Sequence, residues 1–476
     1  MRMKTDSPIW SAIRGGVCCL LGFGVSNMML ADILLAHGAS CVRVYDKKSP
    51  EQLGAIAMQL QTRGVEFFHG EQYLSNLEGD VIFRSPGFRP DKPEIAAAVQ
   101  RGAILSSEME LFLASCEARV IGITGSDGKT TTTTLTWHFL KQAVRERGYG
   151  QVYVGGNIGT SLMPYVQDMT KDDFAVVELS SFQLMTMQQP LAISAITNLS
   201  PNHLDWHIDM DEYVAAKCHI YRGEGACRLV TNRDNEKTLE LAGNAQIPVT
   251  LFSSRLHDYQ SIMQGREGRA VYIKDGVIVC SDGEREQPML QISDILLPGM
   301  HNVENYMTAI GLVQDFVTPE AVQSVARSFG GVEHRFEFVR EKDGVKFYNS
   351  SIDSSPSRTT AALSGIPPRT AWVICGGYDK HIPFEPLARV LRERACGVVL
   401  TGATANAIAK ALDECREGDL ALPIYREPDF EQAVKCAARM AKKGEMVLLS
   451  PACASFDAFE NFAHRGRTFC KIVNQL

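Results

Sequence analysis

The run Val-Ile-Gly-Ile-Thr-Gly-Ser-Asp-Gly-Lys-Thr at residues 120–130 passes from a β-branched segment into an apolar pattern of helical spacing that continues to Val144. This pattern predicts a strand, a tight glycine loop and a helix N-terminus. In such a loop backbone N–H groups converge on an anion, the helix dipole adds positive charge, and Lys129 reaches the terminal phosphates. A threonine hydroxyl then ligates magnesium. We therefore predict a site for a nucleoside triphosphate with Mg²⁺.

The loop is shorter than the common phosphate-binding loop. Ile123 stands where that pattern has its first glycine, and the glycines fall at 122, 125 and 128. The competing interpretation is a glycine-rich turn before an amphipathic helix, with Lys129 merely solvated. We favour phosphate binding because the strand and the helix that the motif requires flank the loop.

Length and composition indicate a cytoplasmic protein of several domains. A chain of 476 residues exceeds one hydrophobic core, so about three domains are expected. The net charge of −7 argues against a nucleic-acid partner. The 13 cysteines form no CxxC pair, as is usual for reduced thiols in a cytosol. No apolar run is long enough for a signal peptide or a membrane span.

The N-terminal segment has the pattern of a mononucleotide-binding βαβ unit. We expect strands at Val17–Leu21 and Val42–Asp46, a turn at Gly22–Gly24 and a helix at Met28–Ala36. Asn27 replaces the third glycine of the dinucleotide fingerprint, so NAD is not favoured. A plain βαβ unit without a ligand is the alternative.

A further strand at Asp80–Phe88 ends in a Pro-Gly turn, where Ser85 and the Gly87 amide are placed to hold a phosphate or sugar. A purely structural turn explains the same residues equally well.

In the central part, polar residues follow apolar strands. Asn157 lies in a glycine turn, Glu178 ends the strand Phe174–Glu178, and His203 and Asp205 follow the strand Ala195–Leu199. A carboxylate at a buried strand end is costly unless paired, so Glu178 either binds a metal or forms an ion pair. His203 is a second candidate ligand, although a lone loop histidine is usually polar surface.

Two helices carry further candidates. Lys217 lies among small and apolar residues in the helical segment Tyr213–Tyr221, and the local pattern by itself favours a surface lysine. A desolvated Lys217 would instead have a lowered pKa and be nucleophilic. Asn302 and Asn305 share one helix face, which suits recognition of a flat heterocycle such as adenine.

Beyond Gly330-Gly331 the signals alternate again between strand and helix, which indicates a second doubly wound unit. The expected fold is α/β with three domains. They are a Rossmann-like unit at 1–116, a phosphate-loop ATPase domain at 117–331 and a Rossmann-like unit at 332–476.

Taken together and in order, these motifs resemble the Mur ligases, and the C-terminal block resembles the branch that adds D-glutamate. The resemblance covers all three domains and rests on Gly125–Thr130, Gly156–Gly159, Glu178–Gln183, Asn202–Asp205, Ala216-Lys217, His301–Asn305, Glu333–Arg335 and Ser450–Asp457 with Phe462–Gly466.

The resemblance implies an ATP- and Mg²⁺-dependent amide ligase of cytoplasmic cell-wall precursor synthesis. It would join D-glutamate to UDP-N-acetylmuramoyl-L-alanine, and we expect a monomer without membrane insertion. The implied catalytic residues are Lys129, Lys217, His203 and Glu178. ATP would be bound by Gly125, Ser126, Asp127, Gly128, Lys129, Thr130, Thr131, Asn302 and Arg335, and magnesium by Thr130, Glu178, His203 and a carbamylated Lys217. The UDP substrate would be bound by Gly22, Asp46, Ser85 and Asn157, and D-glutamate by Lys380, Ser354, Ser455 and Phe462.

Three residues depart from the family pattern. Asn202 and Ser350 stand where many relatives carry aspartate, and Ile352 stands where a basic residue helps to hold D-glutamate. These departures affect local binding and leave the reaction class unchanged. The rival interpretations are a folylpolyglutamate synthetase, which shares the loop, and a nucleotide-dependent switch without ligase activity.

Overall fold

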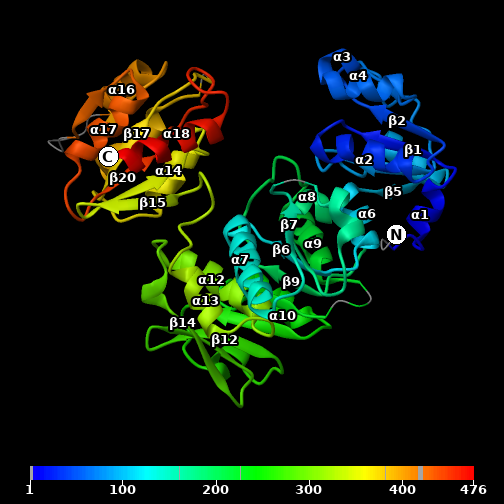
Figure 1. Ribbon diagram of the computed structural model, residues 1–476, viewed down its shortest axis with the longest axis horizontal. Helices are drawn as coiled ribbons and strands as arrows, with labels where there is room; N and C mark the ends of the chain where they lie inside the picture. The colour runs from blue at the N-terminus through cyan, green and yellow to red at the C-terminus, as the bar shows by residue number, and fades with distance from the viewer. Residues whose placement is uncertain (1–3, 160, 224, 226, 381, 416–421) are drawn as a thin grey trace. The chain divides into compact units, whose positions relative to one another are not determined.

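The computed structural model describes residues 4–159, 161–223, 225, 227–380, 382–415 and 422–476. These residues form an α/β structure with three sheets, as expected from the sequence (Figure 1). The chain divides into two compact units. The first comprises the residues up to Asp294 together with His301–Ala326, and the second comprises Ile295–Met300 and Arg327–Leu476. Within the described ranges no helix is both long and apolar enough to cross a lipid bilayer.

The first sheet is parallel, with strand order β3-β2-β1-β4-β5. The expected βαβ unit is confirmed, but its helix begins at Val25, three residues earlier than predicted. Gly22 has φ +79, which lets the chain turn sharply from β1 into this helix. The elements are α1 (Pro8–Ile13), β1 (Val17–Leu21), α2 (Val25–Ala36), β2 (Cys41–Tyr45), α3 (Pro50–Leu53), α4 (Ala55–Thr62), β3 (Glu66–Phe68), β4 (Val81–Arg84), α5 (Pro93–Gln100), β5 (Ile104–Ser106) and α6 (Glu108–Ser115).

The second sheet has the order β14-β13-β12-β11-β10-β9-β6-β8-β7 and is parallel up to β12. The hairpin expected near residues 271–279 is confirmed as β12 and β13. The strands are β6 (Arg119–Thr124), β7 (Val152–Gly156), β8 (Phe174–Glu178), β9 (Ile193–Ile196), β10 (Leu229–Asn232), β11 (Val249–Ser253), β12 (Arg269–Lys274), β13 (Val277–Ser281) and β14 (Glu286–Gln291). The helices are α7 (Lys129–Arg147), α8 (Ser181–Leu184), α9 (Met210–Cys218), α10 (Glu236–Asn244), α11 (Tyr259–Met263), α12 (Met300–Val313) and α13 (Pro319–Ala326).

The third sheet has the order β15-β16-β20-β17-β18-β19, parallel except for the β15–β16 pair. The alternation of strands and helices that we expected beyond Gly330-Gly331 is confirmed. The elements are β15 (Glu337–Lys342), β16 (Val345–Asn349), α14 (Pro356–Ser364), β17 (Ala371–Cys375), α15 (Glu385–Arg394), β18 (Ala395–Leu400), α16 (Ala405–Glu414), β19 (Ile424–Arg426), α17 (Phe430–Met440), β20 (Met446–Leu449) and α18 (Phe462–Gln475).

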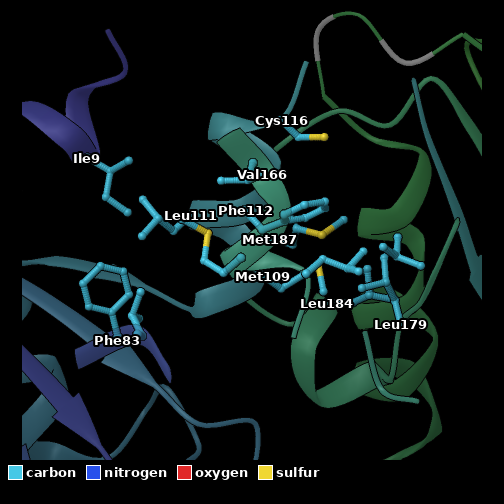
Figure 2. Close-up of a cluster of buried hydrophobic side chains, with 14 of the residues drawn as sticks. Ile9, Phe83, Met109, Leu111, Phe112, Cys116, Val166, Leu179, Leu184 and Met187 are labelled. Atoms are coloured by element: carbon cyan, nitrogen blue, oxygen red, sulfur yellow. The ribbon is translucent and has the colours of Figure 1, made fainter. Parts of the chain in front are cut away.

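The first two sheets share one apolar core. Phe83 on β4 and Met109 and Phe112 on α6 belong to the same buried cluster as Leu184 and Met187 of the central sheet region (Figure 2). Apolar burial on this scale holds the two sheets in one compact unit. The boundaries at 116 and 331 that we expected from the sequence stay predictions.

Candidate active site

The phosphate-loop glycines have conformations that other residues rarely adopt. Gly125 has φ +146 and Gly128, which precedes α7, has φ +78. A Cβ at Gly125 would lie 1.9 Å from Thr197 Oγ1, and one at Gly128 would lie 2.2 Å from Asn305 Oδ1. The loop therefore needs glycine both for its backbone and for its close packing.

Residues after β9 hold this loop in place. The Ser126 N–H donates to the Asn198 carbonyl (2.9 Å), and the Asp127 N–H donates to Asn198 Oδ1 (2.9 Å). Ser126 Oγ lies 2.9 Å from both the Ser200 carbonyl and the Tyr213 hydroxyl. Ser126 and Asp127 thus shape the loop, and their expected contact with ATP stays a prediction. Sequence reasoning missed Asn198, although its place at the end of a core strand was a usable signal.

Lys129, Thr130 and Thr131 begin α7, directly after the loop. The Lys129 ammonium donates to the carbonyls of Gly125 (2.9 Å) and Ser126 (2.8 Å). Because α7 begins here, its amide dipoles add partial positive charge at the same place. The N-terminus of α7 with Lys129 is therefore suited to an anion such as a terminal phosphate.

Lys217 is buried, with 1% of its surface exposed, so the surface position favoured by its local sequence is wrong. Its Nζ donates to Thr124 Oγ1 (3.1 Å) and to the Gly125 carbonyl (2.9 Å), and it lies 4.7 Å from the centroid of the Tyr213 ring. Burial, and then the charge of Lys129, lower the pKa of Lys217 well below its usual value. A neutral amine has two hydrogens for the two acceptors and keeps its lone pair for reaction.

Glu178 ends β8 and is also buried, with 1% of its surface exposed. Its Oε1 accepts a hydrogen bond from Asn157 Nδ2 at 2.7 Å. Its Oε2 is buried without a hydrogen-bond partner among the described residues. Asn157, which we assigned to the UDP substrate, thus contacts the carboxylate, and its substrate contact stays a prediction.

His203 lies in the exposed loop after β9, with the left-handed backbone angle φ +55. Its ring packs edge-on against Phe182, with 4.9 Å between centroids. Burial, and then the charge of Lys129, lower the pKa of His203. A neutral imidazole at this position is suited to bind a metal.

The residues present fit a divalent cation. The unpartnered Glu178 Oε2 is a hard oxygen donor of the kind that Mg²⁺ prefers. No group of three or more His, Cys, Asp or Glu side chains suited to a metal occurs in the described part of the chain. A carbamate on Lys217 would add a second anionic donor beside Glu178.

Two asparagines of α12 lie beside the phosphate loop and the start of α7. Asn305 Oδ1 accepts from Thr132 Oγ1 (3.3 Å), and Asn305 Nδ2 donates to Asn302 Oδ1 (3.4 Å). The predicted pairing of Asn302 and Asn305 on one helix face is confirmed as a contact. Asn302 is thus held near Gly128 through Asn305, and its contact with the nucleotide stays a prediction.

The residues assigned to the UDP substrate, apart from Asn157, meet at the carboxyl ends of β1, β2 and β4. Asp46 accepts from the Phe23 N–H (2.9 Å), and Ser85 Oγ donates to the Gly22 carbonyl (3.3 Å). Asn27 is buried and donates to the carbonyls of Leu21 and Gly22 and to Ser85 Oγ, so it ties this edge together. A crevice at the strand ends of an open α/β sheet is the usual ligand position.

The residues assigned to D-glutamate lie in the second unit, in loops after its strands and at the start of α18. Lys380 Nζ donates to the Ser354 carbonyl at 3.2 Å, so these two meet. Ser455 is buried and Phe462 is exposed at the first turn of α18. Arg335 lies in the same unit, so its contact with the nucleotide bound by the first unit stays a prediction.

A buried arginine joins these loops. Arg465 donates to Ser351 Oγ (3.0 Å), to the Ser351 carbonyl (2.9 Å) and to the carbonyls of Cys453 and Ala454 (3.1 Å each). It was part of the motif that we recognised, but sequence reasoning gave it no role.

The three departures from the family pattern have local partners. Asn202 Oδ1 accepts from the His203 N–H (2.9 Å) and Ser350 Oγ accepts from the Phe336 N–H (3.2 Å). The Ile352 N–H donates to the His334 carbonyl (3.1 Å). Each residue is therefore used in shaping its loop.

Two family models match the central and the C-terminal parts of the chain. A model for the Mur ligase middle domain matches residues 123–313, and one for the Mur ligase glutamate ligase domain matches residues 334–453.

Relatives resemble the chain over nearly its full length. The UDP-N-acetylmuramoylalanine--D-glutamate ligase of Clostridium novyi is 45% identical over 99% of this chain and 100% of its own. The ligase of the same name from Acetivibrio thermocellus is 43% identical, with 98% and 97% covered.

Solved structures share the fold at low identity. A UDP-N-acetylmuramoyl-L-alanyl-D-glutamate--2,6-diaminopimelate ligase has a TM-score of 0.55 and 16% identity, with 96% of this chain and 92% of that chain covered. The MurF ligase of Thermotoga maritima, solved with ADP, has a TM-score of 0.51 and 16% identity, with coverage of 97% and 96%. The 45% identity over nearly the full length places the chain more narrowly than these folds do: it belongs to the Mur ligases, as a member of the UDP-N-acetylmuramoylalanine--D-glutamate ligase family.

Proposed function

We propose that the protein is an ATP-dependent amide ligase that joins D-glutamate to UDP-N-acetylmuramoyl-L-alanine in peptidoglycan precursor synthesis in the cytoplasm. The observation that carries the chemistry is the convergence of Lys129 Nζ and Lys217 Nζ on the Gly125 carbonyl, each at 2.9 Å. The substrates come from the relatives, whose names state D-glutamate ligation.

The reaction begins by activating the carboxylate of the alanyl group. An oxygen of this carboxylate attacks the γ-phosphorus of ATP, the bond to the β–γ bridging oxygen breaks, and ADP leaves. The product is an acyl phosphate. Lys129 and the N-terminus of α7 stabilise the charge on the phosphoryl oxygens, which is the main protein contribution to such a transfer.

The second step forms the amide. The D-glutamate amine attacks the acyl carbon, the tetrahedral intermediate loses phosphate, and the amine proton is released. Lys380 is proposed to pair with a carboxylate of D-glutamate, where its neighbour Ser354 adds a polar group. Water must be excluded, because it would hydrolyse the acyl phosphate.

Magnesium would be held by Thr130, Glu178, His203 and a carbamylated Lys217. When bound, it supplies positive charge to the transferring phosphoryl group. The chain contributes Glu178 Oε2, which has no hydrogen-bond partner among the described residues, and Lys217, whose lowered pKa favours the amine that reacts with carbon dioxide. Without carbamylation, protonated Lys217 would repel the cation.

Release of inorganic phosphate with different acceptors tests the function. We expect release only when UDP-N-acetylmuramoyl-L-alanine and D-glutamate are both present. Release with a folate acceptor and glutamate would support a folylpolyglutamate synthetase instead. Release without any acceptor would support a nucleotide-dependent switch, and either result would refute the proposal.

A further inference from the structure

An arginine of the first sheet region reaches the loop that follows β9. Arg89 lies four residues after Ser85 and donates to both carboxylate oxygens of Glu212 on α9, at 2.8 and 3.1 Å. It also donates to the Trp206 carbonyl (2.8 Å) and lies 5.0 Å from the centroid of the Trp206 ring. Its second carboxylate partner is Asp91 at 2.8 Å. Arg89 therefore joins the turn of the candidate UDP site to the loop of His203.

Glu212 also contacts a buried histidine. Glu212 Oε2 lies 3.1 Å from His207 Nδ1, and His207 Nε2 lies 2.9 Å from Ser181 Oγ. Hydrogen bonds from Arg89 hold the pKa of Glu212 at about 2, so it is an anion. Burial lowers the pKa of His207. A neutral His207 then donates from Nδ1 to Glu212 and accepts at Nε2 from the Ser181 hydroxyl.

The order carboxylate, histidine, serine is that of a hydrolase triad, but these residues are not placed to attack a substrate. Ser181 and His207 are each 2% exposed, so no acyl group reaches the serine hydroxyl. The hydroxyl is fixed at the first residue of α8. The arrangement is suited to holding the backbone in position.

Two of the candidate magnesium ligands, Glu178 and His203, are attached to this network. Ser181 lies three residues after Glu178 and begins α8, directly after the turn that follows β8. The backbone N–H groups of Trp206 and His207 donate to the His203 carbonyl at 3.1 and 3.0 Å, and so close the turn in which His203 has φ +55. Movement of His207 would therefore disturb Glu178 and His203 together.

We propose that Glu212 and His207 are positioning residues for magnesium, and that Arg89 couples them to the turn carrying Ser85. The inference rests on the proposed function, because it takes Glu178 and His203 as the metal ligands. Occupancy of the UDP site and order at the metal site are then linked through contacts within one compact unit.

The test compares Glu212→Ala with Asp211→Ala. Asp211 is an exposed acid at the neighbouring position in the first turn of α9, so loss of charge near the helix N-terminus is matched. Calorimetry measures the affinity of the full chain for a non-hydrolysable ATP analogue, first in EDTA and then in Mg²⁺.

We expect the affinity in EDTA to be unchanged for both variants, because the phosphate loop is intact. The gain in affinity on adding Mg²⁺ should fall about tenfold or more for Glu212→Ala, as for other residues that orient metal ligands. It should stay at the wild-type level for Asp211→Ala. An unchanged gain for Glu212→Ala would overturn the inference.

Two further variants separate positioning from general stability. Glu212→Gln keeps an acceptor for His207 and should recover part of the magnesium gain. Arg89→Lys keeps the charge but loses the paired geometry, and it serves if Glu212→Ala does not fold. If Glu212→Gln lost the whole magnesium gain, or Arg89→Lys lost none of it, the proposed role of the network would be contradicted. If the wild type binds the analogue with magnesium but makes no amide product, the proposed function fails while the positioning result stands.

Discussion

Replacing Glu110 by glutamine should shift the stability of the protein relative to wild type, and this shift should be more favourable at pH 8 than at pH 5. Glu110 lies on α6 and is 3% exposed. Burial raises its pKa to about 7, although the hydroxyls of Ser107 and Thr186 and the charge of Arg84 act in the opposite direction. Arg84 and Glu110 both contact Thr186 Oγ1, so the hydroxyl stands between the two charged groups.

The sign follows from proton linkage. An exposed glutamate has a pKa of 4.5, so the unfolded chain loses this proton first as the pH rises. Folded Glu110 keeps it until about pH 7. The Glu110 carboxyl therefore leaves the free energy of unfolding unchanged below pH 4.5 and lowers it progressively between pH 4.5 and 7. Above pH 7 the loss of stability reaches its full amount. From these two values the change between pH 5 and pH 8 is about 2.5 kcal/mol.

The measurement is the apparent melting temperature of wild type and Glu110→Gln at both pH values. Subtracting the difference between variant and wild type at pH 5 from that at pH 8 removes the effect of the amide itself on hydrogen bonding. We expect the difference between variant and wild type to grow by on the order of 5 °C from pH 5 to pH 8. Glu71→Gln, at an exposed position, is the control and should show no such trend. A difference for Glu110→Gln that is the same at both pH values would refute the reasoning.

Three further predictions concern the phosphate loop and its lysines. Lys129→Ala should abolish phosphate release without changing the melting temperature, and near-normal turnover of the folded variant would remove the phosphate-loop assignment. Lys217→Ala should lose most activity, and a short carboxylic acid added to the assay should restore part of it; retention of full activity would contradict the carbamate. Gly128→Ala should weaken ATP binding by about tenfold or more, because its Cβ would lie 2.2 Å from Asn305 Oδ1 at φ +78, where a side chain is strained. Calorimetry checks this, and wild-type affinity would show that the loop adapts.

Much of the fold could be predicted from local sequence. The strand–loop–helix at 120–147 and the βαβ unit at 17–45 follow from residue periodicity and glycine placement, which act over neighbouring residues. The start of α2 was misplaced by three residues, because Gly24 and Val25 carry no strong helix-start signal. The gathering of Gly22, Asp46 and Ser85 was also predictable, since parallel strands place their carboxyl ends at one edge.

Lys217 shows where local reasoning fails. Its helix alone predicts a surface lysine, and only packing of α9 against the phosphate loop puts its amine on Thr124 and Gly125. Asn157 shows the same limit, because its contact with Glu178 joins residues 21 positions apart at the ends of adjacent strands. No periodic pattern records such a pairing.

The sequence by itself determined the strands, the helices, the glycine loop and, through its motifs, the family of the protein. These depend on local backbone preferences and on residue types in fixed order. Only the tertiary structure decided which side chains are desolvated and which meet, as in the contacts from Arg89 through Glu212 to His207. Burial and charge proximity set pKa values and ligand geometry, and both arise from residues far apart in the chain that packing brings together.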